Sequence, residues 1–361
     1  MRSYNVISAD SHVNSPTDIY AGRMPADLAD RAPRVEESGE GSFWVYEGKK
    51  RPAIGLGHMA GRKFEDYKTN DGSVKFEDVR AGGFFAEERV KDMDIDGMDA
   101  EVLYSGFVGA DIQDPELRHA CMRAYNDWLM DYCNVAPDRL AGLSVLPSWD
   151  KSLMLNEMRR SAKIGMKGCQ IPAYAPFGGS YGDKQYADYW SAVEELGWPA
   201  SIHLGGRTSS GLADNPLPFI ASTTIALAEP FAVIIYGGVL ERHPGLKLIC
   251  TEAGIGWWAY FLERMDNVYH RHRWWTKSDL PQPPSFYFHR NCYSTFQEDI
   301  AGVRVWDLIG SDNIMWASDY PHTDATWPES QKVIEEHFAG VPENEKRKMI
   351  CTNAQGLYFQ S

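Results

Sequence analysis

The sequence predicts a (β/α)8 barrel, because three observations agree. Eight short apolar runs alternate with helix-like segments along most of the 361 residues. Several of these runs end at an acidic or imidazole side chain, and barrels of this kind place their active-site groups at the carboxyl ends of strands. The rival fold, a doubly wound open sheet, expects a glycine-rich phosphate loop after its first strand, and Asp10-Ser11-His12 is not one.

The expected strands are short runs of buried type that end at polar residues, glycine or proline. In chain order they are Val6–His12, Ala100–Tyr104, Leu140–Leu146, Gly168–Ile171, Ala200–His203, Leu246–Thr251, Asn291–Phe296 and Ile314–Ser318. Successive side chains of a strand point to opposite faces, so Asp10 and His12 should project to the same side.

Helix-like segments separate these strands. They are predicted at Glu87–Asp96, Pro115–Ala136, Ser152–Ile164, Tyr186–Leu196, 219–241, Trp257–Trp275, Ala301–Leu308, Glu329–Phe338 and Glu343–Asn353. Gly97, Gly165 and Gly197 stand where a C-cap glycine would end a helix.

Residues 1–356 are expected to form a single barrel domain. Within it, residues 13–86 have little periodicity and many glycines, which predicts a long first loop that covers the active site. The last five residues, 357–361, read Leu-Tyr-Phe-Gln-Ser, and we interpret them as the remnant of a tag-cleavage site.

Composition excludes several classes of protein. The formal net charge is −14 and no run is rich in lysine or arginine, so a nucleic-acid partner is not expected. No apolar stretch reaches the roughly 18 residues that a membrane span needs, and no signal peptide is recognisable. The six cysteines include no CxxC pair, as in reduced cytoplasmic proteins, so we expect a cytoplasmic enzyme with a small-molecule substrate.

Three imidazoles and three carboxylates stand at the ends of predicted strands one, five, six and eight. They are Asp10, His12, His203, Glu252, Asp319 and His322. In a barrel these ends meet at one mouth. Ionisable groups gathered there without compensation would be costly, and a bound cation removes that cost. The pattern therefore predicts that all six side chains are metal ligands.

The ligand types favour a catalytic metal centre over a structural zinc site, because none is a thiolate. Mixed imidazole and carboxylate ligands suit Zn, Mn or Fe. Six ligands exceed what one tetrahedral ion needs, so we expect two metals bridged by a carboxylate, either Asp319 or Asp10. Bridged metal pairs at about 3.5–4 Å serve hydrolysis, whereas paired irons serve oxygen activation.

Four motifs resemble the amidohydrolase superfamily, specifically the branch of aminocarboxymuconate-semialdehyde decarboxylase and the resorcylate decarboxylases. The motifs are Asp10-Ser11-His12, Ile202-His203-Leu204-Gly205, Gly237-Gly238-Val239-Leu240-Glu241-Arg242-His243-Pro244 and Ala317-Ser318-Asp319-Tyr320-Pro321. They span nearly the whole chain. The resemblance implies a TIM barrel in which Asp10, His12, His203 and Asp319 are metal ligands and His243 has a framework role.

Two positions depart from that decarboxylase pattern. Glu252 stands where the decarboxylases typically have a catalytic histidine, and His322 stands where they usually have an apolar residue. The loss of the acid/base histidine speaks against simple decarboxylation. The added carboxylate and imidazole resemble the amidohydrolase-related dinuclear oxygenases, which hydroxylate unactivated carbon with a non-haem diiron or iron/manganese pair.

Three functions are therefore considered, with Glu252 and His322 as the expected catalytic residues. The favoured one is a monooxygenase that uses two irons, or iron and manganese, and O2 to hydroxylate a small organic or carrier- or CoA-linked substrate. The alternative is a metal-dependent hydrolase or decarboxylase of a carboxylate or carbonyl substrate, with Glu252 as proton carrier. The third, a metal-stabilised binding protein, would not need six ligands.

Further residues are predicted near the barrel mouth as substrate contacts: Tyr104, Arg207 and Gln297. Arg207 could pair with a substrate carboxylate or phosphate. Four tryptophans at helical spacing are expected to pack in the core or in the subunit contact of a homo-oligomer, most simply a dimer. They are Trp257, Trp258, Trp274 and Trp275.

Overall fold

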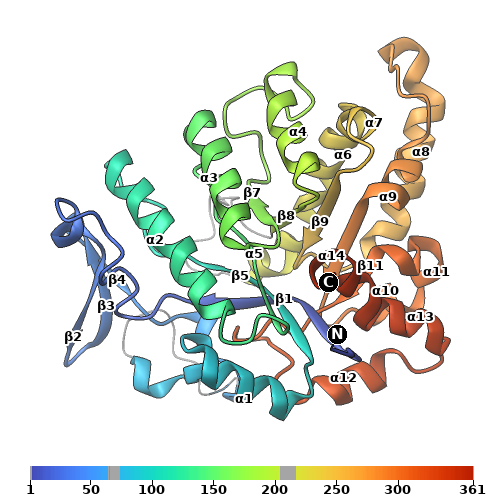
Figure 1. Cartoon of the computed structure of the whole chain (residues 1–361). Coiled ribbons are helices and arrows are strands. Elements are labelled where there is room, and N and C mark those ends of the chain that lie inside the picture. The colour runs from blue at the N-terminus through green and yellow to red at the C-terminus, as the bar shows by residue number, and fades with distance from the viewer. Residues whose placement is uncertain (1, 64, 66–73, 204–216, 361) are drawn as a thin grey trace.

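The computed structural model confirms the barrel (Figure 1), and it describes residues 2–63, 65, 74–203 and 217–360. Each of the eight predicted strands is present. They are β1 (Ile7–Asn14), β5 (Ala100–Gly106), β6 (Leu140–Gly142), β7 (Cys169–Ile171), β8 (Pro199–His203), β9 (Lys247–Thr251), β10 (Cys292–Phe296) and β11 (Ile314–Trp316). The pairings between these strands are parallel, as the alternation with helices requires.

Two sheets join to close the barrel, one ordered β1-β5-β6 and the other β11-β10-β9-β8-β7. A bridge between Ser144 and Cys169 connects the β6 segment to β7. On the other side, the Asp319 N–H donates to the Asp10 carbonyl oxygen over 3.0 Å. The closure places the first and last strands, with their acidic residues, side by side.

The strands are buried on both faces, which explains why they appear in the sequence as nearly continuous apolar runs. All residues of β1 are buried, including its aspartate and histidine. Ile202 of β8 and Leu248 of β9 are fully buried as well. Polar groups that point into such an interior need partners, so Asp10 and His12 should contact other polar groups inside the barrel.

Helices cover the outside of the barrel (Figure 1). Those that agree closely with prediction are α1 (Ala86–Asp96), α2 (Pro115–Cys133), α3 (Lys151–Ile164), α4 (Ala187–Glu195), α8 (Gly256–Thr276) and α12 (Ser330–His337). Asp114 caps α2 by accepting the N–H groups of Glu116 and Leu117. Gly97 and Gly165 end α1 and α3 in the left-handed conformation, as their positions predict.

The predicted helix over residues 219–241 is wrong as one element. The chain forms α5 (Leu217–Thr223), a 3-10 turn (Thr224–Leu227), α6 (Ala228–Tyr236) and α7 (Val239–Arg242). Gly238 has a φ of +69°, which breaks the helical path between α6 and α7. The spacing of apolar residues continues across Gly238, so this spacing does not show where the helix breaks.

Other helices were divided differently from the prediction. The segment 301–308 divides into α10 (Ile300–Arg304) and α11 (Trp306–Ile309), and the last segment into α13 (Glu343–Arg347), a π-helical turn (Lys348–Thr352) and α14 (Asn353–Tyr358). The helix α9 (Pro284–Asn291) was not predicted. It begins with a proline in its first turn, where a missing N–H costs nothing.

The long first loop contains a sheet of its own, which the sequence did not predict. The strands β2 (Arg34–Ser38), β3 (Gly41–Tyr46) and β4 (Lys49–Pro52) form an antiparallel sheet. Further along, the Thr323 N–H donates to the Leu56 carbonyl oxygen over 2.8 Å, and the Ala60 N–H to that of Pro321 over 3.0 Å. These bonds hold part of the loop beside the segment that follows β11. The role of the loop as an active-site cover stays a prediction.

The C-terminal helix α14 reaches the barrel interior. Tyr358 is 2% exposed and packs with Val102, Tyr104 and Ala141. The interpretation of residues 357–361 as a tag remnant stays a prediction.

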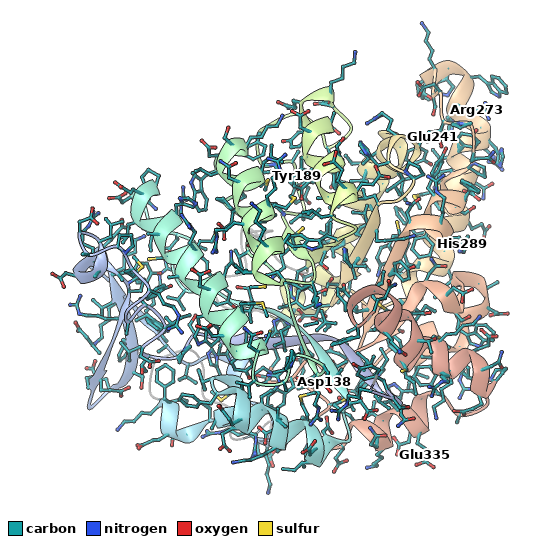
Figure 2. The ribbon with its side chains drawn as sticks, in the orientation of Figure 1. Asp138, Tyr189, Glu241, Arg273, His289 and Glu335 are labelled. Carbon is teal, nitrogen blue, oxygen red and sulfur yellow. The ribbon has the colours of Figure 1, made fainter. Side chains whose placement is uncertain are left out.

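The tryptophans of α8 differ in burial. Trp258 is fully buried and stacks on Trp257 at a centroid distance of 4.2 Å, as core packing predicts. Trp274 and Trp275 are 76% and 72% exposed, next to Arg273 near the outer end of α8 (Figure 2). The expected homo-oligomer stays a prediction. Every helix in the described ranges is too short or too polar to span a lipid bilayer.

Candidate metal centre

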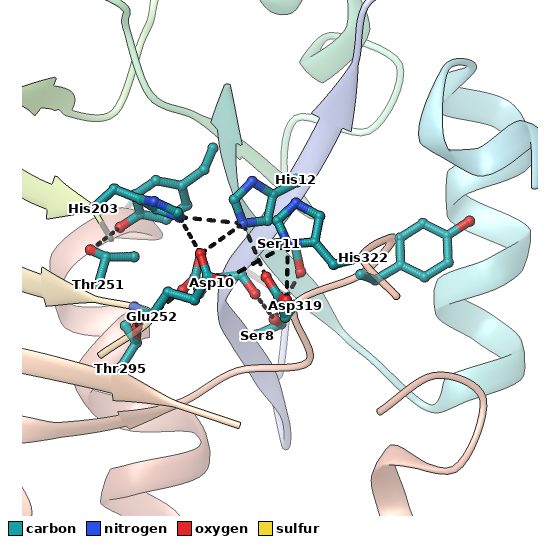
Figure 3. Close-up of polar contacts among 12 residues, drawn as sticks. Ser8, Asp10, Ser11, His12, His203, Thr251, Glu252, Thr295, Asp319 and His322 are labelled. Atoms are coloured by element: carbon teal, nitrogen blue, oxygen red, sulfur yellow. Dashed lines mark hydrogen bonds and ion pairs between the residues drawn. The ribbon is translucent and has the colours of Figure 1, made fainter. Parts of the chain in front are cut away.

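The structure brings together all six side chains that the sequence predicts as metal ligands (Figure 3). Asp10 and His12 lie on β1, and His203 is the last residue of β8. Glu252 follows β9 directly, while Asp319 and His322 lie in the segment after β11. Asp10 lies in the middle of β1 and His12 nearer its carboxyl end, and the other four stand at or just after the carboxyl ends of their strands, where the parallel topology predicts them.

The six side chains form two overlapping groups. One group contains Asp10, His12, His203 and Glu252, and the other His12, Glu252, Asp319 and His322. In each group four ligand atoms lie within 4.8 Å of one another. His12 and Glu252 belong to both, so these two residues link the groups.

In the first group Glu252 contacts His203 most closely. Glu252 Oε2 lies 2.9 Å from His203 Nε2, and this nitrogen lies 3.8 Å from Asp10 Oδ1. The Nε2 atoms of His203 and His12 are 3.4 Å apart. When imidazole nitrogens lie this close to one another and to carboxylates, a shared cation can replace the protons on the imidazoles.

In the second group Asp319 stands between two imidazoles. Its Oδ1 lies 3.0 Å from His12 Nε2, and its Oδ2 lies 3.0 Å from His322 Nδ1. The rings of His12 and His322 stack at a centroid distance of 3.8 Å. Glu252 Oε1 is 4.0 Å from His322 Nδ1, so this carboxylate faces both His203 and His322.

Two carboxylate oxygens of the cluster, Asp10 Oδ1 and Asp319 Oδ1, are buried and accept no hydrogen bond from any described residue. They lie 3.5 and 3.0 Å from His12 Nε2. A buried acceptor without a donor costs about 1–3 kcal/mol, and a charged one costs more. A cation would satisfy both oxygens, so these residues fit a bound divalent metal.

The charges of the cluster favour a positive partner. Burial opposes protonation of His12, but the carboxylates of Asp10 and Asp319 close to its ring raise its pKa to about 10. Burial also opposes protonation of His203, and the Glu252 carboxylate nevertheless raises its pKa. Protonated imidazoles therefore balance the carboxylates when metal is absent, and metal binding should release protons.

The two carboxylates at the ends of β9 and β11 have an unusual backbone. Glu252 and Asp319 have φ values of +57° and +58°, in the left-handed region that non-glycine residues rarely adopt. Such residues cost about 1–3 kcal/mol each and occur mainly at functional sites. Thr295 supports one of them, because its Oγ1 accepts the Glu252 N–H over 2.8 Å and donates to Asp10 Oδ2 over 3.2 Å.

Arg89 of α1, which the sequence did not single out, joins the two ligand-bearing segments from behind. It is fully buried, and its Nε donates to Glu101 Oε2 over 2.5 Å. Its Nη1 donates to the His12 carbonyl oxygen over 2.8 Å, and its Nη2 to that of Tyr320 over 3.4 Å. A helix arginine is usually a surface residue, so only the three-dimensional contacts identify this one.

Arg89→Met is expected to lower the free energy of unfolding by about 3–5 kcal/mol, because Glu101 is left as a buried, unpaired charge. Urea unfolding of the metal-free protein measures this loss. Arg89→Met/Glu101→Leu should recover most of the stability, because a buried ion pair can be replaced by apolar residues. Metal affinity of the double variant should stay about 10–100-fold low, since the donors to the His12 and Tyr320 carbonyl oxygens are still missing. Normal affinity would assign Arg89 a purely structural role.

The predicted substrate contacts have three outcomes. Tyr104 is fully buried, and its hydroxyl donates to Ser201 Oγ over 2.9 Å. Its ring lies 5.1 Å from that of His203, so we expect Tyr104 to orient ligands, not to touch substrate. Gln297 lines a cavity of about 250 Å³ beside Glu252, and its Nε2 is buried without an acceptor among the described residues. Arg207 lies outside the described residues.

A parallel barrel with a cluster of imidazoles and carboxylates at its mouth defines a metal-dependent barrel enzyme. The amidohydrolase family model matches residues 42–360, so the chain belongs to the amidohydrolase family. The framework histidine implied by the family motif, His243, pairs with Glu194 Oε2 at 3.0 Å through its Nδ1.

Several of the proteins to which this chain is similar are decarboxylases. Gamma-resorcylate decarboxylase of Rhodococcus jostii (strain RHA1) is 27% identical over 274 residues, which cover 65% of this chain and 75% of that protein. The structure of 5-carboxyvanillate decarboxylase from Sphingomonas paucimobilis superposes with a TM-score of 0.71 at 20% identity, covering 99% of this chain and 100% of that one. Dihydroxybenzoic acid decarboxylase from Polaromonas sp. JS666, with bound manganese and 2-nitroresorcinol, has a TM-score of 0.66 at 19% identity and covers 98% and 97%.

These comparisons do not support the favoured prediction of an oxygenase. The relatives match the alternative, a metal-dependent decarboxylase, although this chain has Glu252 where a histidine was expected for that reaction. A divalent metal agrees with the ligand cluster. Two irons and O2 have no support among the relatives.

Proposed function

We propose that this protein is a metal-dependent decarboxylase of a small organic acid. The observation that supports it best is the position of Glu252, whose Oε2 lies 2.9 Å from His203 Nε2 within the first ligand group. This carboxylate can hold a proton beside a metal-bound substrate. The decarboxylase relatives support the same reaction class.

Asp10, His12, His203 and Asp319 would hold the divalent metal, with manganese as the first choice because the related Polaromonas enzyme binds it. When bound, the metal supplies Lewis-acid chemistry, neutralising the substrate carboxylate and polarising an adjacent oxygen. Tyr104 and Thr295 orient the ligands from below through the contacts described above.

The proton in this proposal comes from Glu252. In its protonated form, Glu252 delivers the proton to the carbon that bears the substrate carboxylate, and a C–H bond forms. The bond from that carbon to the carboxylate then breaks, its electron pair stays on the carbon, and CO2 leaves. Glu252 regains a proton from water, so each turnover consumes one proton and needs no oxidant. General acid catalysis of this kind contributes about 10²–10⁴-fold.

The second ligand group allows a different use of Glu252. A second metal held by His12, Asp319 and His322 would take Glu252 as a ligand, and its carboxylate would then not be free to move a proton. The number of metals and the role of Glu252 are therefore linked, and one variant can test both.

The proposal predicts oxygen-independent, metal-dependent release of CO2. Protein stripped with a chelator is reloaded with Mn, Zn or Fe(II) and mixed with hydroxybenzoates under anaerobic conditions, while CO2 is measured by mass spectrometry. We expect release only from reloaded protein, at the same rate with and without O2. A product that gains an oxygen atom, and forms only in air, would contradict decarboxylation and restore the oxygenase. Chelated protein without metal is the control.

A further inference from the structure

A second cavity at the barrel mouth is not used by the proposed reaction. It measures about 380 Å³ and lies between the sheet of the first loop and the ends of β1 and β5. Its lining comes from β3 and β4, from the carboxyl end of β1 and the residue after it, and from the end of β5 and the segment that follows. Representative members are Asn14, Trp44, Pro52, His58, Phe107 and Ala110.

The cavity adjoins the candidate metal ligands through Asn14. Asn14 follows His12 by two positions on β1, so the two side chains share a face, and a strand rises about 3.3 Å per residue. The cavity wall at Asn14 therefore begins about 7 Å beyond His12. Gly57 joins both sites, because its carbonyl oxygen accepts Asn14 Nδ2 over 3.1 Å, and a Cβ added to it would lie 3.4 Å from the His322 ring.

The lining is mainly apolar and aromatic. Trp44 and Tyr46 of β3 are 4% exposed, and Phe107 packs on Tyr125 at a ring distance of 5.5 Å. The charged group at the rim is already paired. Asp111 accepts Lys49 Nζ over 3.0 Å and Tyr46 Oη over 2.7 Å, and it also pairs with Arg51. Among the described lining residues, a ligand therefore meets mainly apolar walls, and the charges of Asp111 and Arg51 are already paired.

The cavity across the mouth has the opposite character. The space of about 250 Å³ beside β9 and β10 has four carboxylates in its lining, of which two belong to the ligand cluster; an uncharged body that extended in that direction would cover the other two and remove them from water, which is costly. The four are Asp10, Glu252, Glu298 and Asp299. The body of a carboxylic acid held at the metal should therefore extend toward the apolar cavity above β1.

The size of the apolar cavity bounds the class of substrate. A dry apolar cavity of about 150 Å³ is enough to hold benzene. The volume of about 380 Å³ above β1 is more than twice as large. We propose that the substrate is a carboxylic acid whose uncharged apolar body exceeds one ring, with the carboxylate at the metal and the remainder against Trp44 and Phe107. This inference rests on the proposed function for the placement of the carboxylate.

The test compares two acids that differ by one fused ring. Manganese-loaded Glu252→Gln protein, which lacks the proposed proton donor and therefore does not turn the acids over, is titrated calorimetrically with 2,6-dihydroxybenzoate and with 1,3-dihydroxy-2-naphthoate, which present the same groups on both sides of the carboxylate. We expect the naphthoate to bind at least tenfold more tightly. Equal affinity, or a preference for the single ring, would overturn the inference.

A substitution inside the cavity locates the preference. Ala110→Trp, at an exposed position on the cavity rim, should fill the space and remove the preference for the naphthoate without changing the affinity for the single ring. Ala339→Trp, at an exposed position in the segment after α12, is the matched control and should keep it. An Ala110→Trp protein that folds and retains the preference would refute this location. Because binding is measured without turnover, a correct preference without CO2 release by the wild-type protein would contradict the decarboxylase and leave the cavity assignment intact.

Discussion

Asp319→Asn is expected to weaken metal binding by more than about 100-fold, because loss of a residue that only supports a ligand already costs 10–100-fold. Asp319 Oδ1 is buried without a hydrogen-bond donor among the described residues, and the carboxylate lies between His12 and His322. An amide has the same shape but lacks the charge that holds a cation. Metal content after dialysis, measured by mass spectrometry, should fall to the level of the chelated protein.

The matched control is Asp312→Asn. Asp312 is an exposed acid that pairs with Lys348 at 3.0 Å, away from the cluster. This control should keep the wild-type metal content and activity. Normal metal content in Asp319→Asn would show that Asp319 is not a ligand, and the assignment of the cluster as a metal centre would then need His12 variants for its support.

Glu252→Gln is expected to lower kcat by about 10²–10⁴-fold while metal content stays unchanged. The amide keeps the shape of the side chain and its contact with His203, but it cannot exchange a proton with substrate. Single-turnover measurements with saturating substrate separate this loss from weaker binding. The metal content of the same preparation is the decisive second measurement.

The matched control for this variant is Glu298→Gln, an exposed glutamate that lines the same cavity beside β10. It should have little effect on kcat. If Glu252→Gln loses a bound metal together with its activity, Glu252 is a ligand and the proton in the reaction comes from another group. That outcome would favour the two-metal arrangement formed by both ligand groups.

The clustering of the six candidate ligands could be predicted from local patterns. Asp10 and His12 are two apart in an apolar run, and His203, Glu252 and Asp319 each stand where such a run ends. Strand ends of a parallel barrel share one face, so finding the strands was enough to place these side chains together. The eight strands could be predicted because strands buried on both faces appear in the sequence as continuous apolar runs.

Other parts of the fold could not be predicted this way. The break at Gly238 lies within an apolar period that continues on both sides, and the strands β2 and β4, which pair with the buried strand β3, are short and mostly exposed. Tyr104 was placed near the mouth because it ends a strand, but its hydroxyl donates to Ser201 inside the barrel. A position at a strand end does not determine which way a long side chain turns.

The sequence by itself therefore determined the barrel, the six candidate ligand residues and their chemical types. The tertiary structure decided how they divide into two groups with Glu252 and His12 in common, and which residues hold them in place. Arg89 donates to the carbonyl oxygens of His12 and Tyr320, although these residues lie 77 and 231 positions from it along the chain. Contacts at such separations depend on the closure of the barrel, which brings β1 beside β11, and no local pattern in the chain encodes them.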